Sequence, residues 1–398
     1  MSDYLPEEVV LEILHRLPVK SLIRFRCVSK SWNSLITSSL FINSHLTRSL
    51  SLPSNSNKLI VGHCFDNPLV EHYKLIDDNN DSFDQIQNIE LPLMSRRIQY
   101  FLLIGSVNGL FCLYDDQERY ILWNPSIRKF ITLPKPCTTF DAHGSYIGCC
   151  RQAFGFDPRT NDYKVVRIAF PSRINMSEEA KPPLIEVYSL NEGCWRITSA
   201  SFPPGIAFTD WRQPATSLNG AVHFAAGYEY KPGGPCEPLV LSFDLRDEVF
   251  HVISLPNGTF KWTKSVHTSV IGGSLSVLFY CSKHAYNWCC AIWVMKEYGV
   301  VDSWTKQFTV DLNGGEIKRV LGLQKNGNIL VQTNVGGPYL CELSSYDPKS
   351  KQVKNLGIGG RSYHFHVDNY IENLGLLDKP NDNSFLKESE QEEEMQNH

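Results

Sequence analysis

The sequence predicts a small all-α unit at the N-terminus, followed by an all-β domain that forms a propeller of about six blades. Apolar residues in roughly the first 50 positions recur at helical spacing, whereas later residues fall into short runs rich in Val, Ile, Leu and aromatics. Asn-Gly, Gly-Gly and Asp-Pro pairs separate these runs, and an aromatic marker returns about every 50 residues. With 398 residues, 42% of them hydrophobic and 20% charged, two or three domains are possible, and a fibrous or wholly disordered chain is excluded.

The N-terminal unit is predicted to contain three helices and a short fourth helical segment. The first helix covers residues 5–17 and ends at Pro18. A second helical run follows over residues 19–26, a third begins near Ser29, and a short segment over residues 41–46 completes a unit of about 45 residues. The first helix is indicated by apolar residues at 3.6-residue periodicity: Leu5, Val9, Val10, Ile13, Leu14 and Leu17.

A helical unit this short is close to the size below which an isolated core rarely holds, because it hides too little of its own surface. Each large aliphatic side chain contributes roughly 1.5 to 3 kcal/mol when fully buried, and the first helix carries apolar residues on more than one face. Two or three such side chains left exposed would form an apolar patch. Either the C-terminal domain covers this patch or an external partner does, and physical reasoning alone leaves both open.

The order and spacing of these residues resemble the F-box motif over about residues 4–48. The resemblance is carried by Leu5-Pro6, Ile13-Leu14, Leu17-Pro18, Leu22, Val28-Ser29-Lys30-Ser31-Trp32, Leu35 and Phe41. In that family the motif is a helical hook that docks on the Skp adaptor, and through it on the cullin, of SCF-type ubiquitin ligases. The resemblance implies adaptor-binding residues at Leu5, Pro6, Leu17, Pro18 and Leu22, and residues that pack the helices together at Ile13, Val28, Trp32 and Leu35. We expect an F-box domain at residues 1–48 and a linker at residues 49–57.

The β domain is predicted from a repeat of about 50 residues. The markers of six units are separated by steps of 50, 65, 55, 50 and 53 residues, a period that suits propeller blades of the kelch type. The apolar stretch from Tyr363 to Leu377 is expected to supply a final strand that pairs with the first blade. A doubled β-sandwich is the alternative, and the blade count is uncertain by one. The markers are Tyr73, Trp123, Tyr188, Phe243, Trp293 and Tyr346.

Several stretches of the repeat also resemble the F-box-associated (FBA) interaction domain of plant F-box and kelch-repeat proteins, over about residues 58–377. They are residues 105–110, 123–130, 154–157 with 162–166, and 293–306. The resemblance implies a kelch-like β-propeller that binds a protein to be ubiquitinated. The same group includes the S-locus F-box proteins of pollen, which recognise ribonucleases, and the sequence places this chain neither inside nor outside that subgroup. Residues 378–398 hold seven acids against two bases and are expected to form an acidic disordered tail.

Charge and composition limit the partners. Lys and Arg number 38 against 42 Asp and Glu, and no basic run is longer than a pair such as Arg96-Arg97, so we expect no nucleic-acid partner. The N-terminus is acidic and no window approaches 18 uninterrupted apolar residues, which predicts no secretion, no membrane partner and a place in the cytoplasm and/or nucleus. In that compartment the 12 Cys are expected to be reduced and mostly buried.

The motifs of catalysis and metal binding are not found in the sequence. It has no Gly-x-Ser-x-Gly elbow, no Cys-x-x-Cys pair and no His-Glu-x-x-His helix, so we expect no catalytic residue, no metal and no cofactor. His364 and His366 would share one strand face, but ordinary strand residues explain them better than a metal site. The adjacent pairs Cys149-Cys150 and Cys289-Cys290 are interpreted as buried thiols, because neighbouring strand side chains point to opposite faces.

Binding is better placed than catalysis, because loops that join blade strands escape the constraints of the sheet. Aromatic residues in or near the longest irregular stretches, Trp211, Tyr228 and Tyr230, are candidate anchors for a substrate protein. The preferred function is therefore a non-catalytic substrate receptor of an SCF-type ubiquitin ligase, which acts by holding an unknown substrate close to a charged conjugating enzyme. A non-degradative propeller scaffold and, less favoured, a propeller enzyme are the alternatives.

Overall fold

The computed structural model divides into two compact units. Unit 1 holds residues 1–102, 108–133 and 366–398, and unit 2 holds residues 103–107 and 134–365. The structure describes residues 6–51, 58–65, 70–78, 87–91, 101–115, 118–137, 147–171, 182–209, 213–229, 236–256, 263–282, 288–312, 316–337, 339–362 and 364–380.

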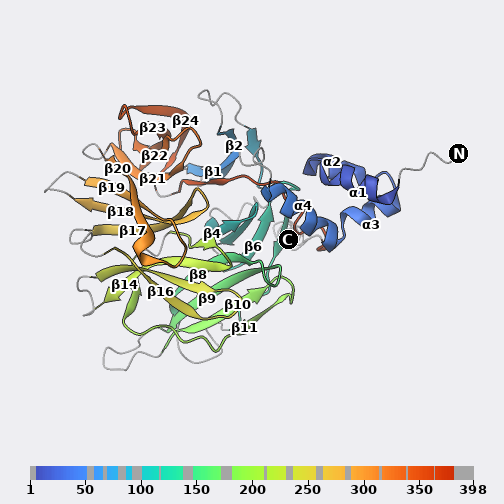
Figure 1. Cartoon of the computed structure of the whole chain (residues 1–398), viewed down its shortest axis with the longest axis horizontal. Helices are drawn as coiled ribbons and strands as arrows, with labels where there is room; N and C mark the ends of the chain where they lie inside the picture. The colour runs from blue at the N-terminus through green and yellow to red at the C-terminus, as the bar shows by residue number, and fades with distance from the viewer. Residues whose placement is uncertain are drawn as a thin grey trace, which may run out of the picture. The chain divides into compact units, whose positions relative to one another are not determined.

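Four helices open the described part of unit 1 (Figure 1). The first three agree with the periodicity, whereas the fourth is longer than the short segment predicted at residues 41–46. They are α1 (Glu7–His15), α2 (Val19–Phe25), α3 (Lys30–Ile36) and α4 (Ser39–Ser51). Pro6 and Pro18 occupy the N-cap positions of α1 and α2, where the fixed φ of proline suits the start of a helix. At the start of α3 the Ser29 hydroxyl accepts a hydrogen bond from the backbone N–H of Trp32 at 3.1 Å.

Six antiparallel sheets account for the strands in the described residues, so the chain carries a six-blade β-propeller and the doubled β-sandwich is ruled out. One sheet has the order β25 (His366–Asn369), β1 (Lys58–Phe65), β2 (Val70–Asp77) and β3 (Gln87–Ile89). Another has β4 (Phe101–Val107), β5 (Leu110–Asp115), β6 (Tyr120–Asn124) and β7 (Lys129–Thr132). A third has β8 (Ile147–Asp157), β9 (Asp162–Pro171), β10 (Leu184–Ser189) and β11 (Cys194–Ile197).

The remaining three sheets lie in unit 2. The first contains β12 (Ile206–Phe208), β13 (Thr216–Leu218), β14 (Ala221–Glu229), β15 (Cys236–Asp244) and β16 (Phe250–Ser254). The second contains β17 (Thr263–Ile271), β18 (Ser274–Ser282), β19 (Trp288–Met295) and β20 (Trp304–Asp311), with the 3₁₀ turn η2 (Val301–Ser303) before β20. The third contains β21 (Ile317–Leu323), β22 (Ile329–Asn334), β23 (Leu340–Tyr346) and β24 (Val353–Arg361).

The last strand of the chain joins the first sheet, as the sequence predicts. β25 pairs with β1 in the register Leu59 opposite Asn369 through Gly62 opposite His366. Because the N-terminal and C-terminal parts of the chain complete one sheet, the free edge that β1 would otherwise present is paired.

The core of unit 2 is built from aliphatic and aromatic side chains of neighbouring strands. Phe208, Phe224, Phe243 and Phe250 belong to or pack against one cluster together with Val222 and Leu241. Phe243 and Phe250 are cross-strand partners on β15 and β16, with ring centroids 4.8 Å apart. Aromatic pairs of this kind add to the stability that burial provides.

Candidate functional site

The helical unit has an apolar core that it shares with the end of the chain. Leu14, Leu22 and Ile36 are fully buried in a cluster that also contains Leu374 and Leu377. We define the C-terminal segment as residues 370–379. The C-terminal segment lies within unit 1, and its leucines cover part of the helical surface that the sequence left without a partner.

Buried amides hold the C-terminal segment in place. Asn124, at the end of β6, donates from Nδ2 to the carbonyl oxygens of Asn373 and Gly375 at 2.9 and 2.8 Å. Asn373 in turn donates from Nδ2 to the carbonyl oxygen of Asn108 at 2.7 Å, and its Oδ1 accepts from the Gly375 N–H at 2.6 Å. Asn124 and Asn373 are both fully buried, and buried polar groups stabilise a fold only when they are hydrogen-bonded in this way.

The turn before β5 fits the C-terminal segment so closely that only glycine is accommodated. Asn108 and Gly109 both have positive φ, 52° and 79°, as a tight hairpin turn requires. A Cβ atom added at Gly109 would lie 2.1 Å from the carbonyl oxygen of Ile371. The Asn-Gly pair read from the sequence as a turn therefore also makes room for the C-terminal segment.

A second face of the helical unit is open. We define the α1 face as Pro6, Val9 and Ile13, which are spaced three and four residues apart and so lie on one side of α1. Val9 is 42% exposed and Ile13 46% exposed, whereas Leu14, next in sequence, is fully buried. The helical unit thus buries one side against its own chain and presents apolar side chains on another.

Two family models match the two parts that this geometry separates. The model of the F-box domain matches residues 3–44, and the model of the F-box associated beta propeller domain matches residues 66–379. The chain belongs to the F-box protein family.

Relatives of this F-box protein are found in Arabidopsis thaliana. F-box/kelch-repeat protein At3g23880 is 30% identical over 312 residues, which cover 77% of this chain and 79% of the relative. F-box protein CPR1 is 27% identical over 405 residues, 98% of this chain and 92% of the relative. F-box protein At3g07870 is 26% identical over 422 residues, 96% of this chain and 94% of the relative.

The predicted adaptor-binding residues of the F-box fall into different environments. Pro6 and Pro18 are exposed and Leu17 is half-buried, while Leu5 lies outside the described residues. Leu22 differs from the prediction, because it is fully buried in the cluster shared with Leu374 and offers no surface to a partner.

The residues predicted to pack the helices together also lie in different environments. Trp32 and Leu35 are half-buried against the helical core. The rings of Trp32 and Phe25 pack edge to face, with their centroids 5.6 Å apart. Ile13 and Val28 lie outside the buried cluster of the helical unit, and 46% and 61% of their surfaces are exposed. On α1 consecutive side chains point about 100° apart, so the burial of Leu14 turns Ile13 outward.

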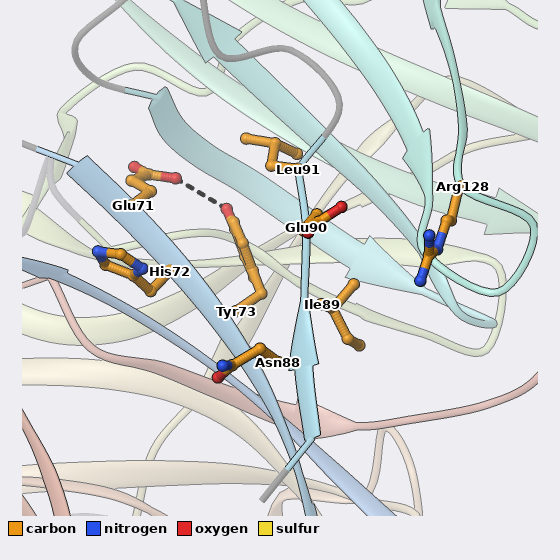
Figure 2. A pocket seen from close by; sticks show the side chains of 8 residues that line it. All are labelled: Glu71, His72, Tyr73, Asn88, Ile89, Glu90, Leu91 and Arg128. Carbon is orange, nitrogen blue, oxygen red and sulfur yellow. Dashed lines mark hydrogen bonds between the residues drawn. The ribbon is translucent and has the colours of Figure 1, made fainter.

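A cavity of about 520 Å³ lies beside β2 and β3 in unit 1 (Figure 2). Glu71 and Tyr73 line it from β2, and their side chains point toward each other, with the Tyr73 hydroxyl donating to Glu71 Oε2 at 2.8 Å. Glu71 Oε1 accepts from the backbone N–H of Phe101 at 3.2 Å. Removal from water raises the pKa of the Glu71 carboxyl to about 7. The other lining residues are His72, Asn88, Ile89, Glu90, Leu91 and Arg128.

A second side chain with a shifted pKa, that of His223, lies in unit 2. His223 on β14 is fully buried, and its Nδ1–H donates to the carbonyl oxygen of Thr216 at 3.0 Å. Its Nε2 then accepts from the Tyr298 hydroxyl at 2.8 Å, which requires a neutral ring. Burial lowers the pKa of His223 to about 4. Both ring nitrogens have protein partners, so this histidine is built into the blade rather than offered to a substrate.

Of the predicted substrate anchors, one is described. Tyr228 is 38% exposed near the end of β14, opposite Ile206 and Glu237. Trp211 and Tyr230 lie outside the described residues.

The cysteines are less uniformly buried than predicted. Those described have free thiols, but Cys149 is exposed and Cys150 half-buried, which corrects the interpretation of that pair as buried. Cys289 and Cys290 are buried. Among the described residues no three His, Cys, Asp or Glu side chains gather into a group able to hold a metal ion. In the part of the chain that the structure describes, no helix is both long and apolar enough to span a membrane.

Proposed function

We propose that this F-box protein is a substrate-recognition subunit of an SCF-type ubiquitin-protein ligase. The F-box binds a Skp-family adaptor, and through it the cullin, and the β-propeller binds a target protein for ubiquitination and degradation. In this proposal the chain itself is not catalytic, because holding the target close to a charged conjugating enzyme raises its effective concentration. The cytoplasm and/or the nucleus is the proposed place of action.

The open α1 face is the observation that supports the proposal best. Val9 and Ile13 keep nearly half of their surface exposed beside a core in which Leu14, Leu22 and Ile36 are fully buried. Burial of such side chains in an interface contributes roughly 1.5 to 3 kcal/mol each when it is complete. More than half of the surface of Val9 and Ile13 is already covered, so an adaptor on this face would gain the remaining fraction of that free energy. It would do so without disturbing the side chains packed on the C-terminal segment.

The contact assignment is revised accordingly. Val9 and Ile13 replace Leu22 among the proposed adaptor contacts, and Leu5, Pro6, Leu17 and Pro18 are retained from the family resemblance. Leu22, Trp32 and Leu35 are assigned to packing within the helical unit. Tyr228 remains the proposed substrate anchor on the propeller, together with Trp211 and Tyr230. The proposed F-box domain extends through α4, which ends at Ser51, and the propeller begins at β1.

Co-purification with a Skp-family adaptor tests the first half of the proposal. The full-length chain is expected to bind the adaptor, and Val9→Asp with Ile13→Asp to weaken binding at least tenfold while leaving the melting temperature within a few degrees. Val300→Asp with Val301→Asp is the matched control, because these side chains are 40% and 39% exposed in unit 2. Equal binding by the Val9/Ile13 variant and the control would reject the α1 face as the adaptor site.

The second half of the proposal concerns the target. Proximity labelling uses the Val9/Ile13 variant, whose weakened adaptor binding is expected to slow delivery of captured proteins to the ligase. It is expected to enrich proteins whose lifetimes lengthen when the chain is removed from cells. If the captured proteins keep their lifetimes, the chain is a non-degradative scaffold.

A further inference from the structure

Two cysteines face each other across the middle strands of one blade in unit 2. Cys281 on β18 is the register partner of Cys289 on β19, and the two strands are antiparallel. Their Sγ atoms lie 3.3 Å apart. Directly opposed residues have Cβ atoms roughly 4.5 to 5.5 Å apart, close to the separation that a disulfide spans, so little backbone movement separates this contact from a covalent bond.

The two thiols differ in access. Cys281 is partly exposed, whereas only 4% of the surface of Cys289 is accessible. Cys290 is directly next to Cys289 but points to the other face of the sheet, where it is fully buried in the cluster that contains Tyr280 and Ile292. The accessible thiol and its buried partner therefore share one face, and the third cysteine is kept away from them.

We propose that Cys281 and Cys289 form a redox-active dithiol that a low-molecular-weight disulfide such as oxidised glutathione converts into a cross-strand disulfide. The Cys281 thiolate attacks one sulfur of the oxidant and expels a glutathione thiolate, which leaves a mixed disulfide on Cys281. The Cys289 thiolate then attacks the Cys281 sulfur and expels the second glutathione thiolate. Two protein thiols lose two electrons and two protons, and one glutathione disulfide becomes two molecules of glutathione.

The disulfide closes a loop of nine residues, 281–289, at the end of the β18–β19 hairpin. Closing a loop removes conformational freedom from the unfolded chain, so oxidation is expected to raise the melting temperature. The loop joins the second and third strands of its sheet, so oxidation fixes covalently a connection between strands that hydrogen bonds otherwise hold. Formation of this disulfide does not require adaptor binding.

The sequence provides a direct test by mass spectrometry. Trypsin cleaves after Lys264, Lys283 and Lys296, so Cys281 and Cys289 fall in separate peptides, residues 265–283 and 284–296. The full-length protein is equilibrated with oxidised glutathione, its remaining thiols are alkylated and it is digested without reductant. We expect the two peptides to be joined, with fragment ions that place the bond on Cys289 and leave Cys290 alkylated.

Single substitutions separate the proposed pair from its neighbour. Cys290→Ser is expected to keep the crosslink, whereas Cys281→Ser abolishes it, and a melting curve of each variant shows that it is folded. Reduction with glutathione is expected to make the thiols of Cys281 and Cys289 reactive toward the alkylating agent again. It is also expected to lower the melting temperature by the few degrees that oxidation added. Absence of the crosslink in the folded native protein, a bond from Cys281 to Cys290, or glutathione retained on Cys281 would each overturn the proposal.

Discussion

Glu372 Oε2 accepts a hydrogen bond at 2.8 Å from the backbone N–H of Val19, the first residue of α2. The N-cap position of α2 is Pro18, which makes no side-chain capping bond, so one of the unpaired N–H groups at the helix start has its partner 353 positions later in the chain. The F-box helices and the C-terminal segment are therefore one folding unit, although they lie at opposite ends of the sequence.

The first prediction concerns the apolar side of this unit. Leu374 is fully buried in the helical core, so Leu374→Ala is expected to destabilise unit 1 by about 2 to 5 kcal/mol through lost burial and the cavity left behind. Leu340→Ala is the matched control, because Leu340 is 52% exposed and its truncation should change stability by less than about 0.5 kcal/mol. Denaturant unfolding of the full-length chain measures both. Equal stability of the two variants would contradict the assigned role of the C-terminal segment.

The second prediction concerns Asn124, whose side-chain amide donates hydrogen bonds to the C-terminal segment. Asn124→Asp replaces an amide that donates to two carbonyl oxygens by a carboxylate that only accepts, in a fully buried position. The loss is expected to exceed about 3 kcal/mol, because the substitution adds a buried charge beside two carbonyl oxygens that lose the Asn124 donor. Asn326→Asp is the control, since the Asn326 side chain is exposed and its Oδ1 accepts from the Asn328 N–H, a role that aspartate keeps. Thermal unfolding with tryptophan fluorescence compares the two, and similar melting temperatures would refute the prediction.

The division of the F-box surface into a covered and an open face is what sequence reasoning missed. Periodicity shows that α1 is apolar on more than one side, but the side that is buried depends on Leu374 and Leu377, more than 350 residues away. The exposure of Ile13 and the burial of Leu22 follow from that contact and are not encoded in the local pattern.

The repeat was easier to predict, and two of the blades share a local contact made by a tryptophan side chain. Trp195, the second residue of β11, donates from Nε1 to the Pro134 carbonyl oxygen at 2.7 Å. Trp304, the first residue of β20, donates in the same way to the Ser254 carbonyl oxygen at 3.1 Å. Pro134 follows Leu133, and Ser254 lies directly before Leu255-Pro256, so both acceptors lie at a Leu-Pro pair.

The cross-strand cysteines show the opposite case. Adjacency in the sequence draws attention to Cys289-Cys290, whereas the close pair is Cys281 and Cys289. Their opposition depends on the register of β18 against β19, and no two-residue turn fixes that register in the sequence.

The third prediction concerns the cavity carboxyl. The pKa of Glu71 rises from 4.5 to about 7 in the folded chain, because burial disfavours the ionised form. The folded state binds the proton more tightly than the unfolded state, so this contribution to stability is complete below pH 4.5 and is lost as the pH rises through 7. Glu71→Gln is expected to remove the loss and to be more stable than the native chain at pH 8, by at most about 3 kcal/mol. Unfolding free energies at pH 5, 6.5 and 8 measure the effect.

The exposed Glu297 provides the control for that series. Glu297→Gln is expected to keep the native fall in stability between pH 5 and pH 8. If Glu71→Gln shows the same fall as this control, Glu71 ionises freely in the folded chain and the cavity does not hold its proton.

The fourth prediction concerns the buried histidine, where the sign is reversed. The pKa of His223 falls from 6.5 to about 4, because burial disfavours the charged ring. Between these values the unfolded chain binds a proton that the folded chain does not, so the contribution of His223 to stability is present above pH 6.5 and is lost as the pH falls toward 4. Since Nε2 accepts from Tyr298 in the neutral ring, protonation would also force this hydrogen bond to reverse, with Nε2–H as the donor. His223→Gln cannot titrate and is expected to flatten the dependence of the unfolding free energy on pH between 4.5 and 6.5, even though it weakens the fold at pH 7.

His251 is exposed on β16 and is not part of this buried network, so His251→Gln serves as the control. A His223→Gln slope as steep as that of the native chain would show that His223 is protonated in the folded protein.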